Sequence, residues 1–362
     1  MQSTDIMEEL NREQTECVLW LKLNRPQPLK SLPASLVRSA IVLMTLVLSM
    51  TLMPLRADAQ TNEAYPSKAI TLVVPSQPGG TADPVARELA QHLSKEFGKP
   101  VVVENRPGAS GAIGATHVAH AAPDGYTLLI GPVTTMVANP LVTETRYQVE
   151  RDFRPVGLLI DAELVLVTTP STGFKTLGDV IQYAKKNPGK LAYGSNGRGA
   201  SHHLAMEYLQ SLAGVELLHV PYQSGAAAEM AMLGGQIQVM IGNTSYVRPH
   251  IRSGRMVGLA VASAERSKAL PDLPLSSATV AGYQLTTWVG LYAPAGTSDE
   301  IVAKLNAATN AFLRDPQNAE ALRSKGLEPR PGSPADFLKF QTEEQKKWGK
   351  IVSFARAKGR LN

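Results

Sequence analysis

The residues of this sequence that could do chemistry are hydroxyl and glycine residues placed between a strand pattern and a helix pattern. The first such stretch follows the apolar run Thr71–Val74 and contains Ser76, Gly79, Gly80, Thr81 and Asp83. Backbone N–H groups at a helix start have no partner within the helix and carry the positive end of its dipole. A carboxylate or phosphate can therefore bind there without a lysine or arginine. The alternative is an ordinary turn, in which the glycines serve only the backbone.

A second stretch of the same design follows the strand pattern Leu191–Ser195. Its candidate residues are Ser195, Gly199, Ala200, Ser201 and His203. Arg198 lies in the same loop and could add charge, although a solvated loop arginine is the commoner outcome. Two strand–glycine–helix units predict two lobes whose helix N-termini face a shared cleft. Thr135 and Asn243 complete the set of candidate ligand-binding residues.

Other chemistries find weaker support. His202 and His203 are adjacent, so they point to different faces of a helix and are poor joint metal ligands. Ser201 near His203 suggests a hydrolase, but no G-x-S-x-G turn is present. The glycine run Gly108–Gly114 resembles a dinucleotide fingerprint only superficially, because it does not follow the first strand. We predict no catalytic residue, no metal site and no cofactor.

The elements that must position the first stretch are a buried strand and a helix. Apolar residues at four-residue spacing predict the helix, and these are Val85, Leu89, Leu93 and Phe97. Asp83 suits the N-cap position, Pro84 suits the first helical position, and Gly98 suits the end of the helix.

The rest of the chain alternates strand and helix patterns, which predicts an α/β fold with a parallel sheet. A buried strand is expected over Pro100–Asn105, and the tail is expected to be helical, with Trp348 and Val352 in the core. Chain crossings near Leu164 and Thr286 would make the second lobe an insertion within the first. Lobe 1 is then 60–163 plus 288–362, and lobe 2 is 164–287.

The first 59 residues are predicted to be a leader that includes a signal peptide. Its apolar segment Ala40–Leu55 follows Arg38 and precedes a small-x-small cleavage site that ends at Ala59. The alternative is an uncleaved membrane anchor, but the segment is shorter than the ~20 residues that span a bilayer. The single cysteine, Cys17, lies in this leader, so the processed chain would contain no disulfide.

The composition is that of a globular protein, with 362 residues, 44% hydrophobic and 19% charged. The net charge is +5, and the basic residues are scattered among acidic ones rather than gathered into runs. We therefore expect no nucleic-acid partner.

A set of short motifs in fixed order goes beyond these generic features. The motifs are Tyr65–Lys68, Val74–Asp83, Val103–Gly108, Ala122–Leu128, Asn139–Pro140, Asp152–Val156, Pro188–Leu191, His203–Leu204, His219–Tyr222, Leu270–Pro274 and Ala293–Thr297. In this order they resemble the Bug-type solute-binding proteins of tripartite tricarboxylate transporters. The resemblance covers the chain from Tyr65 to its C-terminus.

The resemblance implies a type II periplasmic binding-protein fold, two α/β lobes with a ligand cleft between them. It implies that backbone N–H groups, hydroxyls and bridging waters hold a small carboxylate at two loops, Ser76–Asp83 and Ser195–His203. The implied partners are one large and one small integral membrane protein. The chain departs from the family pattern in four places, Ser76-Gln77, Ala200, Gln223-Ser224 and Gly242, and these departures bear on which carboxylate is bound.

The function expected from the sequence is that of an exported, periplasmic and monomeric protein. It would bind a small organic acid and deliver it to a membrane transporter. One alternative is a periplasmic hydrolase or transferase, which would need a nucleophile and a base in hydrogen-bond reach inside the cleft. The other is a ligand-dependent sensor that signals to a membrane receptor, which leaves no mark in the sequence.

Overall fold

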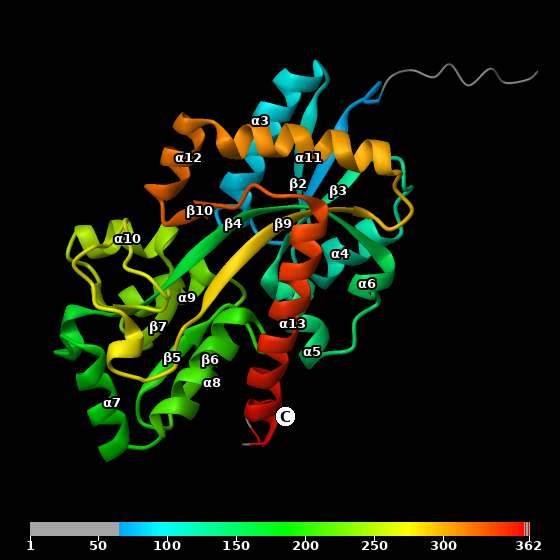
Figure 1. Cartoon of the computed structure of the whole chain (residues 1–362). Helices are drawn as coiled ribbons and strands as arrows, with labels where there is room; N and C mark the ends of the chain where they lie inside the picture. The colour runs from blue at the N-terminus through cyan, green and yellow to red at the C-terminus, as the bar shows by residue number, and fades with distance from the viewer. Residues whose placement is uncertain (1–64, 358, 360, 362) are drawn as a thin grey trace, which may run out of the picture. The chain divides into compact units, whose positions relative to one another are not determined.

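The computed structural model describes residues 65–357, 359 and 361, which belong to one compact unit (Figure 1). The predicted leader, with its apolar segment Ala40–Leu55 and its cleavage site after Ala59, lies outside the described residues. Among the described helices, none combines the length and the apolar character that crossing a bilayer requires.

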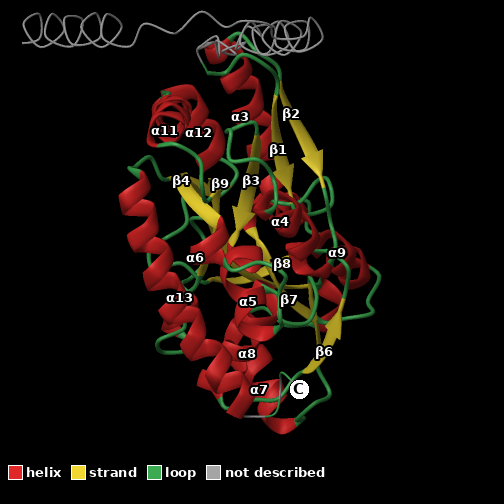
Figure 2. Cartoon of the chain, turned by 90° about the vertical axis from the view of Figure 1, so that its right-hand side faces the viewer, coloured by secondary structure: helices red, strands yellow, loops and turns green. Residues whose placement is uncertain are grey.

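A mixed sheet of ten strands organises the fold, and Figure 2 shows its strands between the helices. The strand order is β2-β1-β3-β9-β4-β7-β5-β6, and β8 and β10 both pair with β4. The strands are β1 (Ile70–Val74), β2 (Val101–Asn105), β3 (Thr127–Pro132), β4 (Phe153–Thr168), β5 (Ala192–Ser195), β6 (Leu218–Pro221), β7 (Val239–Asn243), β8 (Val257–Val261), β9 (Thr286–Pro294) and β10 (Leu327–Pro329).

The long strand β4 joins two halves of this sheet. Its residues from Phe153 to Glu163 pair with β9, and those from Leu164 to Thr168 pair with β7 and β8. We call β1, β2, β3, β9 and β10 the first half, and β5 to β8 the second half. The change of partner falls between Glu163 and Leu164, while the lobe boundaries stay a prediction.

The predicted parallel pairing holds among β1 to β3 and among β5 to β7, and it fails at β9 and β4. β1 is parallel to β2 and β3, and β5 is parallel to β6 and β7. β9 is antiparallel to β3 and β4, and β4 is antiparallel to β7. These two strands carry the chain between the halves in opposite directions. The strand expected over Pro100–Asn105 is present as β2, but the expectation that it is buried was wrong, because β2 is an edge strand and Val102 is 54% exposed.

Helices cover the sheet. They are α3 (Ala82–Phe97), α4 (Ala112–Ala119), α5 (Asn139–Val142), α6 (Val149–Asp152), α7 (Leu177–Lys186), α8 (Ser201–Ala213), α9 (Gly225–Leu233), α10 (Thr244–Arg252), α11 (Asp299–Arg314), α12 (Pro316–Arg323) and α13 (Pro334–Ala357). Short turns of other helix types are η1 (Ala109–Gly111), η2 (Thr134–Ala138), η3 (Pro170–Thr172) and η4 (Ser276–Ala278).

The start of α3 differs from the prediction. Thr81 occupies the N-cap position, so Asp83 and Pro84 are the second and third helical residues rather than the cap and the first. The carboxylate of Asp83 reaches back to the N–H of Gly79 in the preceding loop instead of capping its own helix. The predicted end of the helix at Gly98 is confirmed, with φ +62°.

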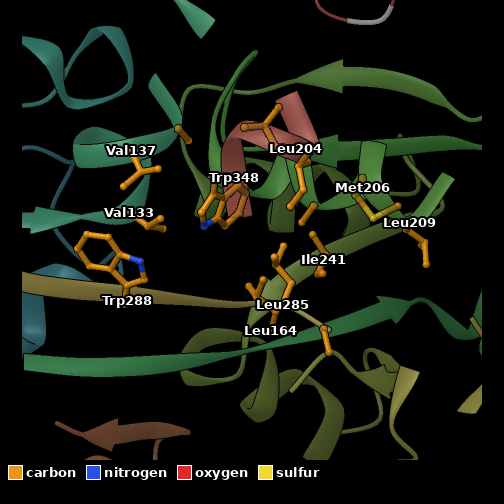
Figure 3. Packing of buried hydrophobic residues seen from close by; sticks show 14 of the residues in the cluster. Val133, Val137, Leu164, Leu204, Met206, Leu209, Ile241, Leu285, Trp288 and Trp348 are labelled. Carbon is orange, nitrogen blue, oxygen red and sulfur yellow. The ribbon is translucent and has the colours of Figure 1, made fainter. Parts of the chain in front are cut away.

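The core lies on both faces of the first half of the sheet and continues into the second. Helices α3 and α11 share one apolar cluster with β1 and β3, and α4, α8 and α13 contribute to another. Figure 3 shows Trp288 of β9 and Trp348 of α13 among the residues of this second cluster, together with Leu164 and Ile241. Trp348 and Val352 are buried, as predicted. Helix α13 therefore packs against both halves.

Candidate ligand-binding site

A cavity of about 530 Å³ lies where the loops after β1, β3, β5 and β7 converge. Ligand sites of α/β proteins commonly lie at the carboxyl ends of parallel strands. The lining consists of Pro75–Ala82, Pro107–Gly111, Pro132–Thr135, Asn196–Gly197, Ser201–His202, Tyr222–Ala226, Glu229, Asn243, Tyr246 and Thr287–Val289. The set contains seven of the predicted residues, namely Ser76, Gly79, Gly80, Thr81, Thr135, Ser201 and Asn243.

The first loop is held by a buried carboxylate that does not line the cavity. Asp83 accepts hydrogen bonds from Gly79 N–H at 3.1 Å, from Asn105 Nδ2 at 3.0 Å and from Arg87 Nε at 3.1 Å. Burial acts to raise the pKa of Asp83, but the hydrogen bonds outweigh it, and the pKa is lowered. The carboxylate is therefore ionised at neutral pH. It holds the loop in place from the side that faces away from the cavity.

Two residues of the first loop have features that suit an anion. The hydroxyl Oγ of Ser76 is buried and has no hydrogen-bond partner in the described part of the chain. Gly79 has φ +85°, a conformation that favours glycine. A Cβ built on Gly80 would lie 3.8 Å from Ser76 Oγ, which is ordinary contact. Gly79, rather than Gly80, is therefore the residue whose backbone requires glycine.

The second loop is held from behind by neutral imidazoles. Gly199 N–H donates to His203 Nδ1 at 3.0 Å, so the proton of the neutral ring is on Nε2. The rings of His203 and His219 stack with centroids 3.9 Å apart. Ser195 Oγ lies 2.7 Å from His219 Nε2. Ser195, Gly199 and His203, all predicted as ligand-binding residues, lie outside the cavity lining and support the loop.

The histidines of this cluster are neutral at pH 7. Burial lowers the pKa of His203 to about 3, with smaller effects from His219 and Arg198. Burial also lowers the pKa of His219 to about 4, with a smaller effect from Arg198.

The start of α8 joins the two halves of the sheet. Ala200 is buried at the N-cap position and does not line the cavity. Ser201 Oγ lies 2.7 Å from Thr134 Oγ1. Thr134 was not among the residues predicted from the sequence. Since Thr134 follows β3 and Ser201 follows β5, this hydrogen bond connects the first half to the second across the cavity.

A third loop, Pro107–Gly111, also lines the cavity and was missed as a binding element. Ala109 and Ser110 have φ +47° and +53°, which non-glycine residues seldom adopt. Thr135 Oγ1 donates to the Ser110 carbonyl at 3.2 Å, and Asn139 Nδ2 donates to that of Ala109 at 2.9 Å. The glycine run was the available signal, but it was weighed only as a dinucleotide motif.

A network of hydrogen-bonded polar side chains lines another part of the cavity. Asn243 Nδ2 donates to Thr287 Oγ1 at 2.7 Å, and Asn243 Oδ1 lies 2.8 Å from His202 Nε2. Tyr246 OH lies 3.3 Å from the same nitrogen. Burial lowers the pKa of His202 to about 4, opposed by its hydrogen bond to Asn243, so the ring is neutral at pH 7. Of the residues in this network, only Asn243 was predicted to bind the ligand.

The lining has little side-chain charge. Within the described part of the chain, no lysine or arginine lines the cavity, and Glu229 is the one Asp or Glu that does. The described residues also contain no group of His, Cys, Asp or Glu that could hold a metal ion. The positive contribution to the field therefore comes from the helix N-termini that reach the cavity, which are those of α3, α8, α9 and α10.

A hydrolase or transferase would need a nucleophile and a base inside the cavity. The Ser195–His219 pair is in hydrogen-bond reach, as a nucleophile and base would be, but neither residue lines the cavity. A molecule in the cavity would therefore meet the loop that covers this pair and not the pair itself.

Comparison with known proteins identifies the family. The family model described as the tripartite tricarboxylate transporter family receptor, TctC, matches residues 85–356. Protein BugT of Bordetella pertussis is 34% identical over 299 residues, covering 82% of this chain and 92% of BugT.

Two solved structures from Rhodopseudomonas palustris are also similar. A protein solved with adipate has 36% sequence identity and a TM-score of 0.78, covering 80% of this chain and 98% of that protein. MatC, solved with bound malate, has 32% identity and a TM-score of 0.74, covering 80% of this chain and 100% of MatC.

These comparisons confirm the resemblance and the α/β periplasmic binding-protein fold predicted from the motifs. The family and these structural neighbours are substrate-binding proteins, so the protein is not an enzyme and the hydrolase alternative was wrong. The chain belongs to the tripartite tricarboxylate transporter receptor family, as a Bug-type member.

Proposed function

We propose that this protein captures a small organic carboxylate in the cavity and delivers it to the membrane subunits of a tripartite transporter. The observation that carries the proposal is the buried, unpartnered hydroxyl of Ser76 in the cavity wall. A buried hydroxyl without a hydrogen bond is unfavourable, and a ligand oxygen that accepts from it removes that penalty. The start of α3 in the same loop favours an anionic acceptor.

The relatives support the chemical class. The two R. palustris structures hold adipate and malate, which are small carboxylates. A cavity of about 530 Å³ falls in the size range of small-molecule sites. Ser76, Thr81 and Ser201 supply hydroxyls from both halves of the sheet, so the carboxylate would be held by neutral donors.

The proposal includes the architecture in which the site works. Lobe 1, 60–163 plus 288–362, and lobe 2, 164–287, would close on the ligand, and the Thr134–Ser201 hydrogen bond would form part of the closed state. The protein would act as a periplasmic monomer after cleavage behind Ala59, with one large and one small membrane subunit as partners. An intact mass that starts at Gln60 in the periplasmic fraction would support this processing, and a membrane-bound full-length chain would contradict it.

Calorimetric titration tests the proposal with adipate and malate as the first probes and further organic acids after them. We expect the Ser76→Ala variant to bind the best acid about tenfold more weakly than the parent, or about 1.4 kcal/mol. Ser353→Ala, which changes an exposed serine on α13, is the matched control and should bind like the parent. A parent protein that binds no carboxylate, or equal binding by Ser76→Ala, would contradict the proposal.

A further inference from the structure

The wall of the cavity formed by α9 and α10 differs in character from the loops. Gly225, Ala226 and Glu229 of α9 line the cavity together, because residues one turn apart share a helix face. Tyr246 of α10 lies beside them, and a Cβ built on Gly225 would be 3.2 Å from its hydroxyl. We call these four residues the distal wall.

Glu229 presents a carboxylate within the distal wall. The residue is only 8% exposed, and its Oε1 pairs with Nε2 of His250. No hydrogen bond to its other oxygen, Oε2, exists among the described residues. Tyr246 lines the cavity with Glu229, and burial raises the pKa of its hydroxyl, with a smaller contribution from the charge of Glu229.

The free carboxylate oxygen has a defined chemical preference. A carboxylate is an acceptor only, so Oε2 pairs with an N–H or O–H donor. A second carboxylate placed nearby would be repelled, and the burial of Glu229 strengthens the repulsion. No described lysine or arginine lines the cavity to offset it. The cavity lining therefore offers hydroxyl and N–H donors at the loops and one carboxylate acceptor, Glu229, at the distal wall.

We propose that Glu229 selects a carboxylate ligand that carries a hydroxyl or ammonium donor at its opposite end, and disfavours the dicarboxylate of equal length. This inference rests on the proposed function, because it takes the ligand carboxylate to be held at the loops. His250 pairs with the other carboxylate oxygen of Glu229, Oε1, and so helps to hold this side chain in place.

Two matched series of acids test this inference by calorimetric titration of the purified protein. One is hexanoate, ω-hydroxyhexanoate, ω-aminohexanoate and adipate, and the other is the corresponding four-carbon series ending in succinate. We expect the parent to bind a donor-bearing acid at least about tenfold more tightly than the dicarboxylate of the same length. Preference for the amino acid over the hydroxy acid assigns the selection to charge, and equal binding assigns it to hydrogen bonding.

Glu229→Gln removes the charge and keeps the side-chain size, and it should reduce the preference to less than about threefold. Glu320→Gln, which changes an exposed glutamate on α12, is the matched control and should keep the full preference. Should Glu229→Gln not fold, His250→Gln provides a second measurement. It removes a potential positive partner of Glu229, so discrimination against the dicarboxylate should increase.

The outcomes separate this inference from the proposed function. If the parent binds the dicarboxylate as tightly as the donor-bearing acids, or if Glu229→Gln leaves the preference unchanged, the role of Glu229 is wrong while carboxylate binding stands. If no acid of either series and no other organic acid binds, both are overturned.

Discussion

The two predicted binding loops have the same design but are held in place by different chemistry. Both follow a strand that has parallel neighbours and precede a helix. The first is held by the ionised carboxylate of Asp83, with Arg87 and Asn105 around it. The second is held by the neutral ring of His203, stacked on His219. In each case a buried side chain accepts the N–H of a loop glycine, Gly79 or Gly199.

This difference teaches that the geometry of such a loop does not require one kind of acceptor. A carboxylate and an imidazole nitrogen both accept the N–H of a loop glycine, although Gly79 is exposed and Gly199 is buried. They differ in how they respond to protons, because an ionised Asp and a neutral His lose their acceptor capacity at different pH. The contributions of the two loops to stability should therefore respond differently when pH is varied or a charge is removed.

The largest expected effect is the loss of stability in acid that comes from the second loop. The folded-state pKa of His203 is about 3, below its ordinary value of 6.5, so between these values the unfolded chain binds a proton that the folded chain does not. The contribution of His203 to stability is full above pH 6.5 and falls by up to about 1.4 kcal/mol for each pH unit below it. From pH 6.5 to 4.5 we expect a loss of about 2–3 kcal/mol.

Urea unfolding of the parent and of His203→Gln at both pH values checks this prediction. Glutamine keeps an acceptor for Gly199 N–H but does not titrate, so the variant should lose less stability between the two pH values. The same pH dependence in both proteins would show that His203 does not carry the effect.

A smaller effect is expected from removing the acceptor of the first loop. Asp83→Ala removes the acceptor of Gly79 N–H and Arg87 Nε and one of the two acceptors of Asn105 Nδ2, so the free energy of unfolding should fall by about 2 kcal/mol. Because the pKa of Asp83 is lowered, its contribution is present above the ordinary value of 3.8 and is lost only as the pH falls through the lower, folded-state pKa. The change should thus be the same at pH 6.5 and 4.5.

Urea unfolding at both pH values measures this change, with Asp272→Ala, an exposed aspartate, as the matched control. Carboxylate affinity should also fall, since the first loop would lose its order. A stability loss that vanishes at pH 4.5 would mean that Asp83 titrates like His203, and the contrast between the loops would fail.

The smallest effect is expected from Arg198, the arginine within the second loop. Arg198 is exposed and does not line the cavity, so it should contribute only long-range attraction that solvent screens. Arg198→Ala should weaken carboxylate binding by no more than about tenfold, or about 1.4 kcal/mol, in titration beside Arg314→Ala as control. Loss of all binding with an intact fold would show that a cation, rather than neutral donors, holds the ligand.

The sequence by itself determined the elements and the loops between them. The apolar run before Pro75, the four-residue spacing from Val85 to Phe97 and the stop at Gly98 are local signals, and the structure has the strand and the helix there. Local spacing also located both glycine loops, and the order of the motifs identified the family. These features were predictable because each depends on neighbours along the chain.

Only the tertiary structure decided which side chains face the cavity. Asp83 and His203 were predicted to touch the ligand, but both lie behind their loops, because the direction of a side chain depends on what packs around it. Thr287 and Tyr246 come from β9 and α10, far along the chain from either loop, and Glu229 faces the cavity from α9. Pairing of β4 with β9 and β7 brings these distant segments together, and no local pattern in the sequence encodes that pairing.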